Sequence, residues 1–320
     1  MRAGARRCET AVMTVMFHST LDDPAEWVPR LQALLPGEDI RVWPDIGDPA
    51  GVEVAVVWIP PDGGLARLAG LRMVQSLGAG INQLGMHAFP SHVRVARLVD
   101  SGLTGMMTEY ALLAALRYAR NFDYHERAQR GSTWDYVMPT GVGSCPVGVL
   151  GLGVIGAAVA RRLAENGFLV SGWARSNKTI DGVTCFSGNE GLPAFLHDLR
   201  VLINLLPLTP QTTNILDEKL FAMLPKGAFV VNIGRGAHLV DADLLAAIDS
   251  GHLGGATLDV FREEPLPAGH PFWLHPRITI TPHCAGTGDP DSAAEVVAEN
   301  IRRAKRGDPL LNEVDRARGY

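Results

Sequence analysis

A short apolar segment that leads directly into three closely spaced glycines constrains this chain more than any other feature. Val147–Leu150 precedes Gly151, Gly153 and Gly156, and the apolar-periodic stretch 157–163 follows. This order predicts a strand, a tight turn and a helix, which is the context that the fingerprint G-x-G-x-x-G requires in dinucleotide-binding folds. The N–H groups and partial positive charge at the start of that helix would bind phosphates.

Each of the three glycines has a separate expected role. Gly151 makes the turn, Gly153 lets a pyrophosphate approach the backbone, and Gly156 lets the helix pack closely on the strand. With 35 glycines among 320 residues, such a match also arises by chance, so the alternative is a strand–helix turn that binds no ligand. The strand before the glycines, the helix after them and a further strand expected at 168–173 favour the dinucleotide interpretation.

Size, charge and cysteine spacing limit the class of protein. A chain of 320 residues is longer than the usual length of a domain with a single hydrophobic core, which favours two domains. With 47% apolar residues, a net charge of −5 and no basic run, we expect a soluble globular protein with no nucleic-acid partner. The cysteines lack C-x-x-C spacing and no apolar stretch could span a bilayer, so we expect a cytoplasmic protein without membrane contact or bound metal.

Alternating strand and helix patterns predict an α/β fold with two parallel sheets. In the first part of the chain, strands are expected at 12–17, 52–59, 71–77 and 93–98, and a helix at 24–34. A long apolar helix is expected at 105–129 and a loop at 131–145. In the second part, strands are expected at 147–150, 168–173, 201–205, 229–233, 255–260 and 277–280, and helices at 157–163, 217–223, 241–250 and 293–306. Asp241 is the expected N-cap of one helix, and Ser292 with Glu295 has capping-box spacing in another.

Three polar residues follow three consecutive strands expected in the second sheet. They are Arg235, Glu264 and His283. Because the carboxyl ends of parallel strands open on one edge, where ligands bind, the three side chains can converge there. Taken singly, each could be an ordinary surface or structural residue, but their common placement favours a shared site.

These residue types suit the reduction of a 2-keto acid. A guanidinium binds a carboxylate bidentately, and a protonated imidazole donates to a carbonyl oxygen that becomes an alkoxide. Glu264 would be the carboxylate that favours the charged form of His283. The alternative nucleophile is Cys284, but chain neighbours in an extended segment point to opposite faces and nothing marks the thiol as activated.

The residues after the second strand of the fingerprint unit indicate the cofactor. NAD-specific folds place an acidic residue about 20 residues past the glycines, where it bonds the ribose 2′-hydroxyl. Here Trp173 and Ala174 are followed by Arg175, Ser176 and Lys178, with no acidic residue among them. Arg175 can stack on adenine and bind a 2′-phosphate, so NADP(H) is expected as the preferred cofactor and NAD(H) remains possible. The alternative is a solvated loop.

A glycine-rich turn also ends a strand of the first part, at Leu77, Gly78, Ala79 and Gly80. Such a turn can present bare N–H groups to an anion such as a carboxylate. The alternative is a plain strand–helix turn.

Together these motifs resemble the D-isomer-specific 2-hydroxyacid dehydrogenase family. The motifs that carry the resemblance are GLGVIG (151–156), LLPLTP (205–210), VNIGRG (231–236), LDVF (258–261) with Glu264 and Pro265, and TPH (281–283). Within the family the chain is most similar to the glyoxylate/hydroxypyruvate reductase A type, through segments 201–207, 244–251, 265–267 and 77–80 and through Trp43. The resemblance covers nearly the whole chain after about residue 12.

The resemblance implies two Rossmann-like domains, with the cofactor domain (103–284) inserted into a split, flavodoxin-like substrate domain (1–102 plus 285–320). It implies an NADP-preferring enzyme that reduces glyoxylate or hydroxypyruvate to the D-2-hydroxy acid. In that reaction Arg235 would bind the carboxylate, Glu264 would pair with His283, and His283 would be the acid/base. A homodimer through the cofactor domains is also implied, with helix 105–129 and the following loop contributing.

The resemblance further implies which residues line the two binding sites. The expected cofactor-binding residues are Gly151, Leu152, Gly153, Val154, Ile155, Gly156, Trp173, Ala174, Arg175, Ser176, Lys178, Leu206, Pro207, Thr212, Ile233, Gly234, Asp259 and His283. The expected substrate-binding residues are Trp43, Leu77, Gly78, Ala79, Gly80 and Arg235. The chain departs from the family pattern at Asn82, where an acid is common, and in the glycine-rich run 284–290.

Two other functions fit the same residues. One is a dehydrogenase of this fold acting on another 2-hydroxy acid, of the D-lactate or phosphoglycerate type. The other is a non-catalytic, dinucleotide-sensing scaffold, since one fold serves unrelated functions.

Overall fold

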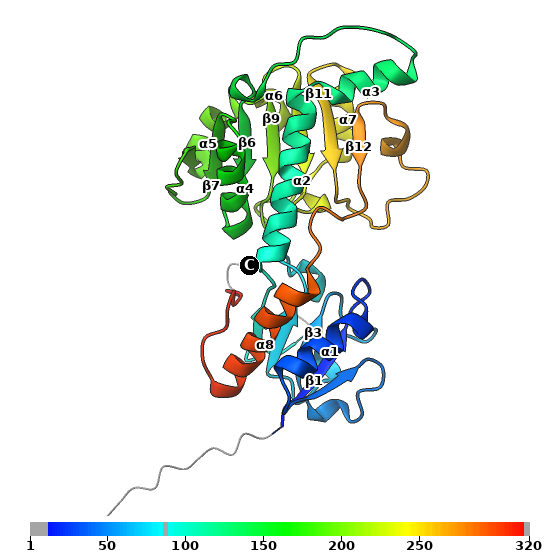
Figure 1. Ribbon diagram of the computed structural model, residues 1–320, viewed down its shortest axis with the longest axis vertical. Coiled ribbons are helices and arrows are strands. Elements are labelled where there is room, and N and C mark those ends of the chain that lie inside the picture. The colour runs from blue at the N-terminus through cyan, green and yellow to red at the C-terminus, as the bar shows by residue number, and fades with distance from the viewer. Residues whose placement is uncertain (1–11, 86–88, 317–320) are drawn as a thin grey trace, which may run out of the picture. The chain divides into compact units, whose positions relative to one another are not determined.

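The computed structural model describes residues 12–85 and 89–316 and shows two compact units, each built on one parallel sheet (Figure 1). The smaller unit combines Met1–Gly102 with Gly288–Tyr320, and the larger unit is Leu103–Thr287. The sequence predicts boundaries after residues 102 and 284. The α/β fold with two parallel sheets is confirmed.

The smaller unit has its five strands in the order β2-β1-β3-β4-β5, which is the flavodoxin-like order. Its strands are β1 (Thr14–His18), β2 (Asp39–Val42), β3 (Val52–Val57), β4 (Met73–Ser76) and β5 (Arg94–Ala96), its helices α1 (Pro24–Leu34) and α8 (Pro290–Arg306), and its short 3₁₀ turns η1 (Pro49–Gly51), η2 (Leu65–Arg67) and η3 (Asn82–Leu84). Successive side chains of β1 point to opposite faces, and both faces are buried. Val15 and Phe17 pack in the core that α1 and α8 cover, whereas Met16 packs in the core on the other face.

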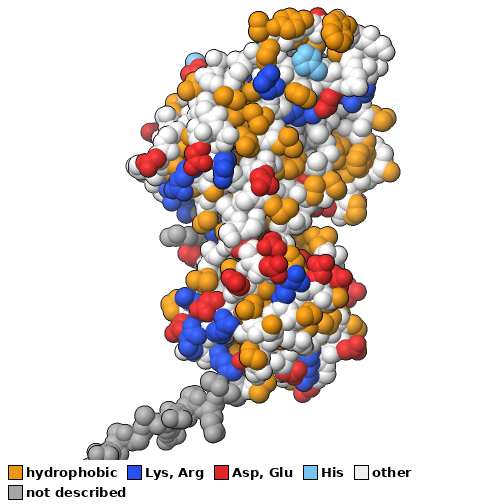
Figure 2. Space-filling view, viewed as in Figure 1, with side chains coloured by type: hydrophobic (Ala, Val, Ile, Leu, Met, Phe, Trp, Pro, Cys, Tyr) orange, Lys and Arg blue, Asp and Glu red, His pale blue; other side chains and the backbone are white. Residues whose placement is uncertain are grey.

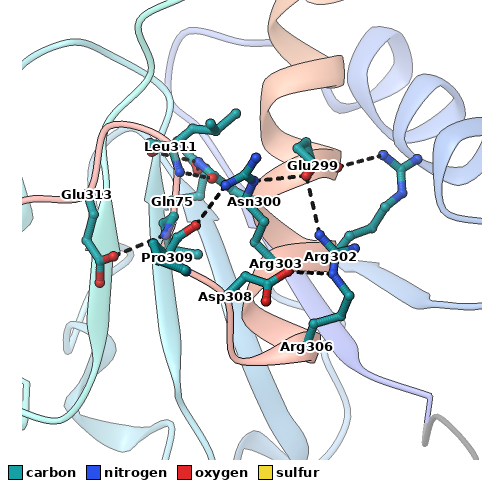
Figure 3. A network of polar contacts seen from close by, with 11 residues as sticks. Gln75, Glu299, Asn300, Arg302, Arg303, Arg306, Asp308, Pro309, Leu311 and Glu313 are labelled. Atoms are coloured by element: carbon teal, nitrogen blue, oxygen red, sulfur yellow. Dashed lines mark hydrogen bonds and ion pairs between the residues drawn. The ribbon is translucent and has the colours of Figure 1, made fainter.

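Helix α8 is tied to β4 by a buried amide pair (Figure 3). Asn300 and Gln75 are both fully buried, and Asn300 Nδ2 donates to Gln75 Oε1 at 2.8 Å. Asn300 also donates to the Leu311 carbonyl at 3.1 Å and accepts from the Leu311 N–H at 2.7 Å. Because a buried amide is stable only when it is hydrogen-bonded, this pair fixes α8 and the chain after it against the sheet.

The larger unit has seven parallel strands in the order β12-β11-β10-β9-β6-β7-β8. Its strands are β6 (Val147–Leu150), β7 (Val170–Ala174), β8 (Val183–Ser187), β9 (Val201–Asn204), β10 (Ala228–Asn232), β11 (Leu253–Leu258) and β12 (Ile278–Ile280). Its helices are α2 (Ser101–Ala119), α3 (Phe122–Arg130), α4 (Val154–Glu165), α5 (Gly188–Leu196), α6 (Glu218–Met223) and α7 (Asp241–Asp249), with 3₁₀ turns η4 (Val142–Ser144), η5 (Gly236–His238) and η6 (Pro271–Leu274). The strand order reverses at β6, which is the switch point where doubly wound sheets bind ligands.

Helix α2 lies against the larger sheet (Figure 1). The Tyr118 ring stacks on Phe229 of β10 with centroids 4.0 Å apart, and its hydroxyl lies 2.7 Å from Thr257 Oγ1 of β11. After α3 the chain runs as an extended arch before β6, and Figure 2 shows hydrophobic side chains exposed over this region. Within the described residues, no helix is both long and apolar enough to cross a bilayer.

Several local predictions are wrong. The helix expected at 105–129 is two helices, because Asn121 has φ 56°, a left-handed conformation that asparagine tolerates better than most residues. Asp241 is the first residue of α7 and Val240 is its N-cap, and α8 is capped by Asp289 in place of the expected Ser292–Glu295 box.

Three elements have no counterpart in the sequence prediction: β2, β8 and α5. The two strands lie at sheet edges and are only half-buried, so their hydrophobic patterns are weak. The helix contains two glycines and Pro193, which lower its intrinsic helical propensity.

Candidate active site

The three glycines of the loop after β6 differ in the space around them. Gly151 has φ 109°, and a Cβ there would lie 2.9 Å from the Leu205 carbonyl carbon. A Cβ on Gly156 would lie 1.8 Å from the Gly151 carbonyl oxygen, so helix α4 can approach β6 only without a side chain there. Gly153, the N-cap of α4, has no atom within 4 Å of its Cβ position. This open backbone at a helix N-terminus fits the pyrophosphate of a dinucleotide.

The residues after β7 include two basic side chains and a hydroxyl. Arg175, Ser176 and Lys178 are exposed beyond the carboxyl end of the strand, next to the glycine loop because β7 pairs with β6. Trp173 and Ala174 are buried, and Trp173 Nε1 donates to the Gly188 carbonyl at 2.8 Å. The loop therefore offers two cations and a hydroxyl and no carboxylate from residues 174–178.

The other predicted cofactor residues differ in exposure. Those that are buried are Gly151, Leu152, Gly156, Leu206, Ile233, Gly234 and Asp259, and those partly or fully exposed are Gly153, Val154, Ile155, Pro207, Thr212 and His283. The Thr212 hydroxyl donates to the Pro207 carbonyl at 2.7 Å, which closes the loop after β9 on itself.

Arg235 lies in the turn after β10 and is half-buried. Its Nη1 donates to the Gly234 carbonyl at 2.7 Å. Burial lowers the pKa of Arg235, and the charge of Glu264 opposes that shift. An arginine remains a cation in proteins, so the turn presents a fixed positive charge near Glu264.

Glu264 and His283 form a direct pair. The Nδ1 atom of His283 lies 2.6 Å from Oε2 of Glu264, and Oε1 of Glu264 accepts the Phe261 N–H at 2.8 Å. Burial opposes ionisation of Glu264, but the hydrogen bonds from His283 and from the Phe261 N–H outweigh it, and the pKa of Glu264 is lowered. The carboxylate is therefore ionised at neutral pH beside the imidazole. The structure thus brings Arg235, Glu264 and His283 together at the carboxyl ends of three adjacent strands.

The His283 backbone is fixed by Asp259. His283 has φ 54°, and its N–H donates to the Asp259 carbonyl at 2.8 Å. The buried Asp259 carboxylate accepts from Thr281 Oγ1 at 2.6 Å and from the N–H groups of Cys284 and Ala285, each at 2.9 Å. These bonds hold the uncommon backbone conformation of His283 in place.

Cys284 is a poor nucleophile in this setting. Burial of the thiol and the nearby Asp259 carboxylate raise its pKa, which keeps it protonated.

The turn after β4 in the smaller unit is shaped by Trp58 and Ser76. A Cβ on Gly78 would lie 2.1 Å from Cζ3 of Trp58, so only glycine fits. The buried Ser76 Oγ accepts the Gly78 N–H at 3.2 Å and donates to the Gly80 carbonyl at 3.1 Å. In the described part of the chain, no group accepts from the N–H groups of Ala79 and Gly80.

Trp43 follows β2 in the same unit. Its ring lies edge-on to His18 with centroids 6.4 Å apart, and the Arg67 guanidinium lies 5.9 Å from its centroid. A cation at this distance attracts the ring face and limits its rotation.

Several residues around the site were not predicted from the sequence. The buried polar ones are Asn204, Asn232 and His238, and the partly buried Thr281 is bonded to the Tyr110 hydroxyl. The available signal was an asparagine at the end of each of two apolar strands, VLIN and AFVVN, where a buried amide needs partners.

Comparisons with known proteins point to one family. Residues 112–285 match the family model for the D-isomer specific 2-hydroxyacid dehydrogenase, NAD binding domain. A Yersinia enterocolitica protein named glyoxylate/hydroxypyruvate reductase A is 44% identical over 314 residues, which are 96% of this chain and 100% of the relative.

Solved structures agree with that family. A D-isomer specific 2-hydroxyacid dehydrogenase from Xanthobacter autotrophicus Py2, in complex with NADPH and MES, superposes with a TM-score of 0.92 at 44% identity over 97% of this chain and 100% of the other. An NADPH-dependent glyoxylate/hydroxypyruvate reductase from Sinorhizobium meliloti, in complex with NADP and sulfate, gives 0.90 at 35% identity over 96% and 100%.

Proposed function

The chain belongs to the D-isomer-specific 2-hydroxyacid dehydrogenase family, and we propose that it reduces glyoxylate and hydroxypyruvate to D-2-hydroxy acids with NADPH. The observation that carries this proposal is the 2.6 Å contact between His283 and Glu264, near Arg235 on the carboxyl edge of a dinucleotide-type sheet. The names of the relatives support the choice of substrates and the bound ligands of the solved structures support the choice of cofactor.

His283 is the proposed proton donor. When bound, NADPH supplies the hydride that reduces the keto carbon. Because Nδ1 of His283 lies against Glu264, we assign proton donation to Nε2. The hydrogen bond between Nδ1 and the Glu264 carboxylate fixes the orientation of the ring and leaves Nε2 to give up the proton.

Arg235 is the proposed carboxylate ligand. Its guanidinium can bind both oxygens of a 2-keto acid and thereby orient the carbonyl. Partial burial strengthens this attraction, since less water screens the charges than at an open surface. In the smaller unit, the N–H groups of Ala79 and Gly80 are the proposed anion-binding groups of the turn after β4.

NADP(H) is the proposed preferred cofactor. Arg175 and Lys178 would attract the 2′-phosphate, and Ser176 would add a hydroxyl. The loop after β7 lacks the carboxylate that would bond a ribose 2′-hydroxyl and repel that phosphate.

We further propose that the enzyme is a homodimer through the larger unit. Exposed apolar side chains gather on α2, α3 and the arch at 131–140, namely Leu113, Phe122, Trp134, Tyr136 and Met138. An exposed apolar surface of this kind marks an interaction site. Light scattering should give twice the chain mass for the parent protein and a smaller mass for a Leu113→Glu, Trp134→Glu variant. A monomeric parent would contradict the proposal.

A cytoplasmic location is proposed from the cysteines. Cys145, Cys185 and Cys284 are free thiols, which a reducing compartment favours, and Cys8 lies outside the described residues.

Initial rates test the function directly. Glyoxylate, hydroxypyruvate and pyruvate should each be assayed with NADPH and with NADH. We expect the highest kcat/KM with NADPH and glyoxylate or hydroxypyruvate. A preference for pyruvate would indicate a D-lactate type instead, and no turnover despite NADPH binding would indicate a sensing scaffold.

A further inference from the structure

Three fully buried polar side chains lie beneath the turn that carries Arg235. They are Asn204 at the end of β9, Asn232 at the end of β10 and His238 in η5. Asn232 Nδ2 donates to the Arg235 carbonyl at 3.1 Å, and the Arg235 N–H donates to His238 Nδ1 at 3.2 Å. Buried side chains therefore hold both polar groups of the Arg235 backbone.

Asn204 completes this cluster. Its Nδ2 lies 2.9 Å from Asn232 Oδ1 and 2.9 Å from His238 Nδ1. A Cβ on Gly234 would lie 3.0 Å from Asn204 Nδ2 and 3.2 Å from His238 Nδ1. The turn at Gly234 therefore packs directly against Asn204 and His238.

The hydrogen bonds determine the tautomer of His238. Its Nδ1 receives two donors, the Arg235 N–H and the Asn204 amide, so Nδ1 carries the lone pair. The proton must then reside on Nε2, which lies 3.3 Å from the Pro207 carbonyl and donates to it. Burial also lowers the pKa of His238 to about 4, so the ring is neutral at physiological pH.

We propose that His238 is a positioning residue whose two ring nitrogens serve two different binding loops. Its Nδ1 orients Arg235, the proposed carboxylate ligand, and its Nε2 orients Pro207, in the loop predicted to bind the cofactor. The part of this proposal that concerns Arg235 depends on the proposed function. His238 itself has no exposed surface, so it acts through the residues that it contacts.

Two substitutions separate the contacts. In His238→Asn, the side-chain oxygen takes the place of Nδ1 and the bond to Pro207 is lost. In His238→Gln, the side-chain nitrogen can take the place of Nε2 and the acceptor for Arg235 is lost. We expect His238→Gln to raise KM for glyoxylate about three- to tenfold with little change in NADPH affinity, the range expected for one hydrogen bond. We expect His238→Asn to weaken NADPH binding by a similar factor, measured by fluorescence titration without substrate, with little change in KM.

His252 provides the matched control. The Nε2 atom of His252 lies 2.7 Å from the Phe221 carbonyl. His252 directly precedes β11, at the amino end of the strand and away from the proposed site. His252→Asn loses a similar bond and should leave both constants near the parent values. The proposal would be overturned if both His238 variants changed KM for glyoxylate and NADPH affinity to the same extent. It would also be overturned if neither variant changed KM or NADPH affinity.

A measurement on the unmodified protein covers the case in which the variants do not fold. Nitrogen-15 NMR of labelled histidine at pH 6 should show the His238 ring neutral with its proton on Nε2, and the other tautomer or an imidazolium at His238 would overturn the proposal. A parent protein that reduces no 2-keto acid would instead refute the proposed function, and the Nε2 contact would still be decided by the NADPH titration.

Discussion

Glu264 and His283 are in contact although 19 residues separate them in the chain, with Oε2 and Nδ1 2.6 Å apart. Two adjacent parallel strands, β11 and β12, each end shortly before one member of the pair. Roughly a third of each side chain is exposed, so the pair lies at a surface that substrate can reach. A short hydrogen bond to a carboxylate fixes the orientation of the imidazole that we propose as the proton donor.

Replacing Glu264 by Gln should lower kcat for reduction about five- to tenfold. The His283 imidazole loses a charged hydrogen-bond partner 2.6 Å from its Nδ1, and a neutral amide makes a weaker bond than a carboxylate. Steady-state kinetics with glyoxylate measure the loss. An unchanged kcat would show that the Glu264 carboxylate does not assist His283.

Replacing His283 by Ala should reduce kcat by on the order of 10²–10⁴, the usual contribution of a general acid. NADPH binding should persist, which a fluorescence titration can check. Reduction of glyoxylate at nearly the parent rate would mean that another group donates the proton.

Replacing Arg235 by Lys should impair both KM and kcat, because an ammonium group lacks the planar arrangement of donors that binds a carboxylate bidentately. We expect KM to rise and kcat to fall, with a larger loss for Arg235→Ala. Steady-state kinetics with glyoxylate decide this. If kcat/KM of the Ala variant equals that of the parent, Arg235 is not the carboxylate ligand.

Replacing Arg175 by Ala should lower kcat/KM with NADPH but not with NADH. The lost contact concerns the 2′-phosphate, which NADH lacks, so kcat/KM with NADH should stay nearly constant. Arg161→Ala, on the exposed surface of α4, is a matched control that should leave both cofactors unaffected. An equal loss with NADPH and NADH would argue against a phosphate contact.

The buried neutral state of His238 should make the larger unit acid-sensitive. In the unfolded chain the histidine binds a proton below its ordinary pKa of 6.5, whereas in the fold it does so only near a pKa of about 4. The contribution of the neutral His238 to the free energy of unfolding is therefore fully present above pH 6.5. It is lost as pH falls toward 4, and the loss is on the order of 3 kcal/mol. Urea unfolding at pH 7, 6 and 5 should show a steeper decline for the parent than for His238→Asn. Equal slopes would contradict a neutral buried histidine.

The sequence predicts the two parallel sheets, and the edge on which the strands β10, β11 and β12 end, because both depend on local patterns. Apolar strands followed by helices imply parallel pairing, and parallel pairing places the ends of β10, β11 and β12 on one edge. The common placement of Arg235, Glu264 and His283 at this edge could therefore be predicted without knowledge of any contact. The glycine roles are equally local, since Gly156 is required by the carbonyl of Gly151 in the same turn.

The supporting network could not be predicted because its partners are distant in the chain. Asn204 reaches His238 across 34 residues and Asn232 across 28, and a shift of one residue in the register of β9 and β10 would break these bonds. The break at Asn121 depends on a left-handed backbone that most sequences around an asparagine do not adopt.

The placement of α8 determines when the smaller unit can be completed during synthesis. The ribosome releases β1 to β5 before it has made the larger unit, yet the core on one face of their sheet needs Val297 and Ile301 of α8. Gln75 likewise receives a hydrogen bond from Asn300 only after that helix emerges. The larger unit is continuous in the chain, so it can fold first while the earlier strands still expose apolar surface. Until α8 has been made, newly synthesised chains therefore expose apolar surface that the complete fold covers, which makes this stage prone to aggregation.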